Sequence, residues 1–143
     1  MQASPFATSI FGAATLLLGL MSSAVLACDC DTPPAPKVAL KQADAVFAGK
    51  VLDVQPLEKG EYPVLVRVQV EANWKGADKP EMVLQTGPGY ADCGFPFETG
   101  RRYLIYAFAL KGEKNLIATI CSRTKGLADA QEDLDALGPG LKP

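Results

Sequence analysis

Four cysteines are the residues of this sequence best suited to covalent or metal chemistry. Cys28 and Cys30 are close together, whereas Cys93 and Cys121 are distant. The chain has no Cys-x-x-Cys pair and no histidine, which argues against a structural zinc site. In an exported protein an even number of cysteines favours disulfides. A ring between Cys28 and Cys30 would be strained, so we expect each to pair with one of the distant cysteines.

The residue content also limits the possible function classes. Without histidine, neither a Ser-His nor a Cys-His nucleophile can form, and no pair of carboxylates stands out from the others. The formal net charge is −2, without the basic surplus that phosphate binding requires. We therefore expect a monomeric binding domain that is not an enzyme, uses no cofactor and binds no nucleic acid.

The N-terminal segment has the features of a removed export signal. Residues 1–27 carry no charge, and their apolar run 10–26 is too short and too rich in small residues to favour a membrane span. Val25-Leu26-Ala27 suits signal peptidase. We expect 1–27 to be a signal peptide and 28–143 to be one secreted or periplasmic domain without a membrane span. An uncleaved anchor is the alternative, because no Lys or Arg precedes the apolar run.

The segments between the cysteines show the apolar patterns of β-strands. Alternation is clearest over 64–74, and strands are also predicted over 45–55, 81–86, 101–110 and 116–120. Gly49 is expected at a bulge or bend of the first strand. One face of the 64–74 strand, including Trp74, is expected in the core; it consists of Val64, Val66, Val68, Val70, Ala72 and Trp74.

Two short helices are predicted, over 37–43 and 128–137. The second is amphipathic, and its acidic residues Asp129, Glu132, Asp133 and Asp135 are expected on the solvent face. Five strands in so short a chain predict a mainly β fold. We expect a five-stranded OB-like β-barrel, closed or partly open, with a short N-terminal helix and a C-terminal helix, because closure removes exposed edges.

Several short motifs follow one another along the chain. They are Cys28-x-Cys30, Ala43-Asp44-Ala45-Val46-Phe47-x-Gly49-Lys50-Val51, Trp74-Lys75-Gly76, Cys93-Gly94, Gly100-x-x-Tyr103-Leu104-Ile105, and Cys121. In this order and spacing they resemble the N-terminal, netrin-like domain of the tissue inhibitors of metalloproteinases. The resemblance is closer to the short bacterial proteins that carry this domain alone, and it covers nearly all of 28–143.

The resemblance implies an OB-like barrel in which Cys28 is joined to Cys93 and Cys30 to Cys121. In the animal inhibitors, the α-amino group and carbonyl oxygen of the first cysteine chelate the catalytic zinc of the protease. Such a chelate suits a zinc ion with an open coordination position. By the same resemblance Cys28 would bind a partner's zinc through backbone atoms and Asp29 would enter the specificity pocket. The flanking residues would be Cys30, Ala91 and Asp92.

The sequence departs from the animal inhibitors at two positions. Lys41 stands where they have a further cysteine, and Asp29 stands where they have a small uncharged residue. Burying an unpaired carboxylate is costly, and Asp31 and Asp92 would make the same edge more acidic. We therefore expect weak or no inhibition of matrix-type metalloproteinases, with another zinc metalloproteinase as the possible partner.

Cys28 has two other interpretations. It could be only a structural half-cystine, in a non-inhibitory structural or adhesive interaction module. It could also carry a lipid, since Val25-Leu26-Ala27-Cys28 is a loose lipobox. Lipidation would leave three cysteines for pairing, which is unfavourable in an exported protein, and it would block the amine that zinc chelation needs. The two functional interpretations of Cys28 therefore exclude each other.

Overall fold

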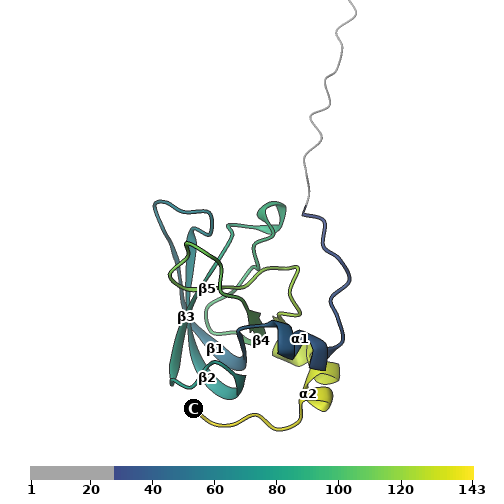
Figure 1. The fold of residues 1–143 in the computed structure, drawn as a ribbon. Coiled ribbons are helices and arrows are strands. Elements are labelled where there is room, and N and C mark those ends of the chain that lie inside the picture. The colour runs from purple at the N-terminus through teal and green to yellow at the C-terminus, as the bar shows by residue number, and fades with distance from the viewer. Residues whose placement is uncertain (1–27) are drawn as a thin grey trace, which may run out of the picture.

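The computed structural model describes residues 28–143, so the predicted signal peptide 1–27 lies outside the described part. A curled sheet packs beside two short helices, with the C-terminus at the opposite end from the start of the described chain (Figure 1). The elements in chain order are α1 (Pro36–Gln42), β1 (Ala45–Pro56), β2 (Val64–Lys75), β3 (Glu81–Thr86), η1 (Tyr90–Asp92), β4 (Arg102–Ala107), β5 (Leu116–Ile117), β6 (Lys125–Gly126), η2 (Leu127–Asp129) and α2 (Gln131–Leu137).

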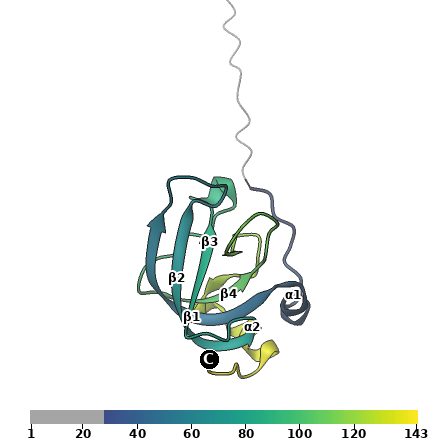
Figure 2. The same cartoon turned by 60° about the vertical axis from the view of Figure 1, so that its left-hand side comes forward.

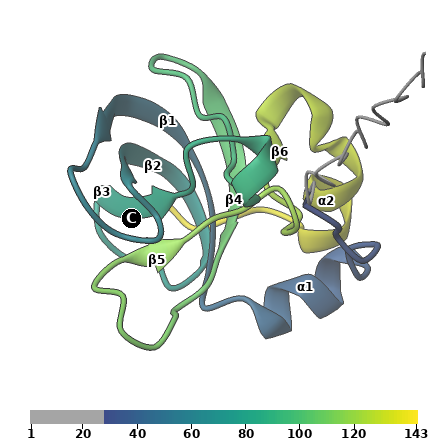
Figure 3. The ribbon, with the colours of Figure 1, turned by 90° about the horizontal axis from the view of Figure 1, so that it is seen from above.

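The strands of the described part form one six-stranded sheet in the order β5-β3-β2-β1-β4-β6. Neighbouring strands are antiparallel, except that β3 and β5 are parallel. The sheet curls into a half-barrel, which is visible from above (Figure 3). The prediction of a mainly β fold with two short helices is confirmed. The prediction of five strands was wrong, and the sheet is not a closed barrel.

A short β5 explains why the curled sheet does not close. The predicted strand over 116–120 is reduced to Leu116–Ile117. The end of β4 reaches it through one residue pair, in which Phe108 and Ile117 exchange hydrogen bonds of 2.9 and 2.8 Å. Closing a barrel requires a continuous ladder between its last strands. The sixth strand, Lys125–Gly126, has only two residues, so it shows no alternation that sequence reasoning could detect.

The sheet has a hydrophobic core on each of its two faces. The concave face buries Phe47, Val51, Val66, Val68 and Ile105 among others. The opposite face packs against α1 and α2, which lie together on one side of the sheet (Figure 2). The first half of β1 and nearly all of β4 are buried on both faces, as expected for central strands. No helix of residues 28–143 has the length and apolar character needed to cross a bilayer.

Bulges in the β1–β2 ladder produce the bend of the sheet. The register shifts between Ala48 and Gly49, where β2 has the additional residue Glu71, so the expected irregularity at Gly49 is confirmed. A Cβ at Gly49 would overlap the backbone carbonyl of Gln69. After this bulge the side chain of Trp74 packs with the core that faces the helices rather than with the barrel interior.

Two residues of the Trp74-Lys75-Gly76 motif bind the C-terminal ends of both helices to the sheet. The indole Nε1 of Trp74 donates a 2.8 Å hydrogen bond to the carbonyl of Gly138, beyond α2. The ammonium of Lys75 donates to three carbonyls at the end of α1, at 3.3 Å to Leu40, 3.0 Å to Lys41, and also to Ala43. A cation at this position satisfies carbonyls that lack helical partners. The motif therefore has a structural role in this fold.

Candidate functional site

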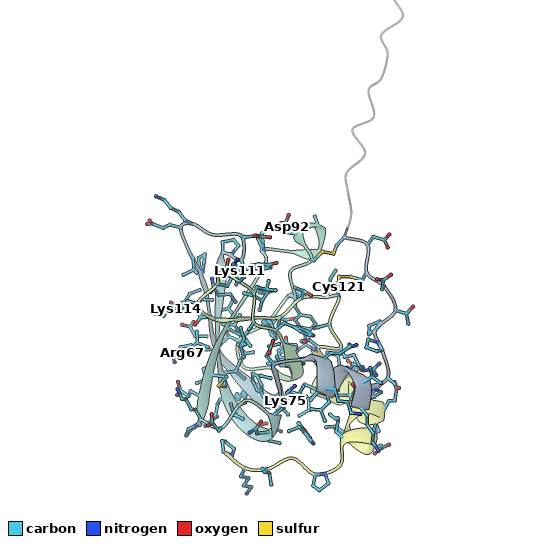
Figure 4. All side chains as sticks on the ribbon, viewed as in Figure 1. Arg67, Lys75, Asp92, Lys111, Lys114 and Cys121 are labelled. Atoms are coloured by element: carbon cyan, nitrogen blue, oxygen red, sulfur yellow. A yellow bond between two sulfur atoms is a disulfide. The ribbon has the colours of Figure 1, made fainter. Side chains whose placement is uncertain are left out.

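Two disulfides bring the four cysteines to one end of the molecule. Cys28 is bonded to Cys93, with their Cα atoms 5.2 Å apart, and Cys30 is bonded to Cys121 at 5.1 Å. Figure 4 shows Asp92 and Cys121 at this end, near the start of the described chain. This is the pairing that the family resemblance implies. It attaches the first three described residues to the β3–β4 loop and to the segment before β6.

Backbone contacts hold the two distant cysteines beside each other. The amide of Ile120 donates a 3.0 Å hydrogen bond to the carbonyl of Cys93, and Gly94 forms a β-bridge with Thr119. Cys93 has a φ of 56°, in the left-handed region that few residues other than glycine adopt. A Cβ at Gly94 would overlap the carbonyl of Gly87, so the Cys93-Gly94 pair fits a tight crossing of the chain.

The residues that the family resemblance predicts to face a protease form an exposed edge at these disulfides. For that predicted role we call it the inhibitory edge, and it consists of Cys28, Asp29, Cys30, Asp31, Ala91 and Asp92. Asp29, Asp31, Ala91 and Asp92 are exposed, and the cysteines are half-buried. The disulfide between Cys28 and Cys93 joins the two chain segments that carry Asp29 and Asp92. None of the ion pairs among residues 28–143 involves the three aspartates of this edge. The edge therefore presents carboxylates that are available to a partner.

An open groove of about 500 Å³ adjoins the inhibitory edge. Its walls come from the β1–β2 loop and from the β3–β4 loop, and they consist of Gly60, Glu61, Tyr62, Pro63, Pro88, Asp92 and Cys93. Burial, together with the nearby carboxylates of Glu61 and Glu113, raises the pKa of the Tyr62 phenol. A partner that covered Cys28 would therefore also meet this groove, where the titratable groups are acidic or phenolic.

One arginine holds the extended chain segment that follows the cysteines of the inhibitory edge. Residues 31–35 run extended, as prolines require, and Arg123 donates a 3.0 Å hydrogen bond from Nη1 to the carbonyl of Pro34. The same guanidinium donates to the Asp133 carboxylate, at 2.7 Å from Nε and 2.9 Å from Nη2. The segment that leads to the disulfides is thus attached to the interior of the fold.

Asp133 is the buried centre of a polar cluster, and the expectation that it lies on the solvent face of the last helix was wrong. Its side chain is 0 % exposed. It accepts hydrogen bonds from Arg123, from Lys125 Nζ at 2.7 Å and from the Tyr106 hydroxyl at 2.8 Å. Burial alone would raise its pKa, but these donors outweigh it and hold the pKa at about 2. Burial and the hydrogen bond to Asp133 raise the pKa of Tyr106, and the hydrogen bond to Asp133 raises that of Arg123.

The sequence does indicate that Asp133 is buried, although the helical pattern was interpreted as placing it on the solvent face. Ala130, Leu134 and Leu137 recur at helical spacing, and Asp133 lies within the same stripe, three residues after Ala130. A carboxylate inside an apolar stripe needs a cationic partner. Arg123 and Lys125 precede the helix and are suited to that role, although their spacing alone does not identify them as partners.

Comparison with known proteins does not assign this chain to a family. A scan against models of known protein families found no match to this chain. A search of curated proteins likewise found no match. The functional interpretation therefore depends on the residues and on the geometry of the inhibitory edge.

Proposed function

We propose that this chain is an exported, disulfide-linked domain of the netrin-like OB type that inhibits a zinc metalloendopeptidase. The α-amino group and carbonyl oxygen of Cys28 would chelate the zinc of the protease, and Asp29 would point into its specificity pocket. The observation that carries the proposal is the position of Cys28, which is bonded to Cys93 on an exposed edge with Asp29 beside it.

Preorganisation of the inhibitory edge supports this proposal. Two disulfides and the hydrogen bond from Arg123 to Pro34 restrict the first residues of the domain. A segment already held in one conformation loses less conformational entropy when a partner binds it. The disulfides close loops with sequence separations of 65 and 91, and loops of this size contribute about 4 kcal/mol each to stability in the chain-entropy model.

Asp29 defines the kind of protease that would be inhibited. Its carboxylate is exposed and has no ion-pair partner among the described residues. An apolar specificity pocket would have to bury this charge unpaired, which is unfavourable by several kcal/mol. We therefore propose a target whose pocket is polar or contains a cationic side chain, and weak or no inhibition of matrix-type enzymes.

Extending the N-terminus tests the proposal directly. We would compare the chain that begins at Cys28 with one that has an alanine added before Cys28, against a panel of zinc metalloendopeptidases. The added residue converts the amine into an amide, which does not coordinate zinc as an amine does, so inhibition should be lost. A matched control carries the alanine after Pro143 instead and should retain inhibition. Equal inhibition by both extended chains would refute zinc chelation.

A non-inhibitory interaction module is the second candidate, and the acidic character of the inhibitory edge favours it. Asp29, Asp31 and Asp92 are exposed there, with Glu61 in the adjoining groove. Such a surface could bind a basic structural or adhesive partner without any zinc. Anchoring at a membrane by lipid on Cys28 would require that its sulfur be free of the disulfide to Cys93. This interaction would survive the N-terminal alanine, and it would weaken with added salt because exposed charges are screened.

A further inference from the structure

Three of the four sulfur atoms of the two disulfides form a single cluster. Sγ of Cys28 lies 3.5 Å from Sγ of Cys121 and 3.8 Å from Sγ of Cys30, without a covalent bond to either. All three sulfurs lie within 4.8 Å of one another. The fourth sulfur, that of Cys93, is bonded to Cys28. Although the chain has no Cys-x-x-Cys pair, the fold thus brings three possible thiolate ligands to one point and holds a fourth next to Cys28.

Two of the sulfur–sulfur separations match those of a tetrahedral zinc site. A zinc–sulfur bond of about 2.3 Å places the sulfurs of a regular tetrahedron about 3.8 Å apart. The non-bonded separations of 3.5 and 3.8 Å are already close to this value. Once both disulfides are reduced, the sulfurs of each former pair need only move apart to the same distance. Side-chain rotation can supply that movement while the backbone stays in place.

Contacts independent of the disulfides keep the four residues together. The hydrogen bond from Ile120 to the Cys93 carbonyl joins the two distant segments, and the bond from Arg123 to the Pro34 carbonyl holds the N-terminal segment. Neither contact involves sulfur. The ligand positions are therefore constrained by the fold itself, which reduces the entropy lost when a metal binds.

We propose that the reduced chain binds one Zn²⁺ through the thiolates of Cys28, Cys30, Cys93 and Cys121. For each disulfide, one phosphine reductant and one water yield two thiols and the phosphine oxide. Zinc then displaces the four thiol protons, so the product is a tetrathiolate complex and four H⁺. The oxidised chain has no such ligands. This zinc would be bound by the chain itself, so the proposal is independent of inhibition through a protease's zinc.

Cobalt titration of the reduced protein tests the inference. Co²⁺ occupies tetrathiolate sites and, unlike Zn²⁺, gives a thiolate charge-transfer band and visible absorption of tetrahedral cobalt. We expect saturation at one cobalt per chain, displacement by zinc, and no band with the oxidised protein. Cys121→Ser should weaken cobalt binding at least about tenfold, since even the loss of a residue that only hydrogen-bonds a metal ligand has an effect of this size. Asp135→Asn, at an exposed position of α2, should leave it unchanged.

Near-ultraviolet circular dichroism shows whether the metal binds a folded chain, because Trp74 is packed in the core that faces the helices. The expected result is a native signal for the reduced protein with zinc. If reduction alone unfolds the chain, zinc should restore that signal. The proposal would be overturned by the absence of a charge-transfer band, by equal affinity in Cys121→Ser, or by cobalt binding to a chain that stays unfolded.

Discussion

Replacing Asp133 with asparagine tests how the interior supports the inhibitory edge. The carboxylate is fully buried and accepts hydrogen bonds from Arg123, Lys125 and Tyr106. Removing one partner of a buried ion pair destabilises proteins by about 3–5 kcal/mol, because the remaining charge is left unpaired. Here the Lys125 side chain is 28 % exposed and Arg123 keeps a 3.2 Å contact with Glu132. We therefore expect the lower end of this range, about 3 kcal/mol.

The same carboxylate gives the protein a defined acid sensitivity. Its pKa is about 2 in the folded chain, against 3.8 for an unperturbed aspartate. A group whose pKa is lowered by folding stabilises the native state above its unfolded pKa, and this contribution is lost as the pH falls through the folded value. The difference corresponds to about 2 kcal/mol, lost between pH about 4 and 2. The Asp133→Asn variant should lack this pH-dependent contribution to stability.

Urea unfolding at several pH values measures both effects. The midpoint for Asp133→Asn should fall at pH 7, and the difference from the natural chain should shrink on going to pH 2. Asp135→Asn is the matched control, since Asp135 lies on the same helix but is exposed, and it should change stability by less than about 0.5 kcal/mol. An unchanged midpoint for Asp133→Asn, or an equal loss in both variants, would refute the role assigned to the buried cluster.

Three further substitutions test other parts of the structure. Lys75→Met removes the cation from the carbonyls that end α1, so amide exchange in α1 should accelerate while that of β1 stays slow; uniform protection would contradict the capping role. Trp74→Phe removes the bond to Gly138 and should lower the free energy of unfolding by about 1 kcal/mol in urea titration; no loss would show that the bond is unimportant. Asp29→Ser removes the exposed carboxylate and should strengthen inhibition of matrix-type metalloproteinases at least about tenfold. Weaker or unchanged inhibition would show that Asp29 does not limit binding.

Parts of the fold follow directly from local patterns in the sequence. The alternation of valines predicted β2 because one of its faces is buried and the other is exposed. The strand over 81–86 and the helix near 37–43 were also located correctly. At Gly49 the absence of a side chain indicated the bulge, which the close approach of Gln69 explains. Each of these features depends on the neighbours of a residue in sequence.

The remaining features depend on contacts between distant residues. The two residues of β6 are a strand only because β4 lies beside them, and β5 ends at Ile117 although strand-forming residues continue after it. Asp133 is acidic and part of a helix, so its burial is understandable only when Arg123 and Lys125 are known to face it. The clustering of the Cys28, Cys30 and Cys121 sulfurs is likewise a product of the tertiary fold, because 91 positions separate Cys30 from Cys121.

The buried cluster and the inhibitory edge are connected through Arg123. One guanidinium contacts both the Asp133 carboxylate and the carbonyl of Pro34, and Pro34 lies shortly after Cys30. Loss of the carboxylate would remove the contacts that orient this guanidinium. The stability of the interior and the position of the N-terminal residues are therefore coupled in this structure.

The central claim requires that Cys28 be the first residue of the exported protein and carry a free amine. Intact mass and N-terminal sequencing of the protein secreted by its own host test this most directly. We predict a chain that begins at unmodified Cys28 and is lighter than its reduced form by four hydrogens, two for each disulfide. A diacylglycerol mass on Cys28 would contradict the claim, because the lipid would occupy the sulfur that forms the disulfide to Cys93. A chain that begins at another residue would also contradict it, because the α-amino group of Cys28 would then be part of a peptide bond or absent.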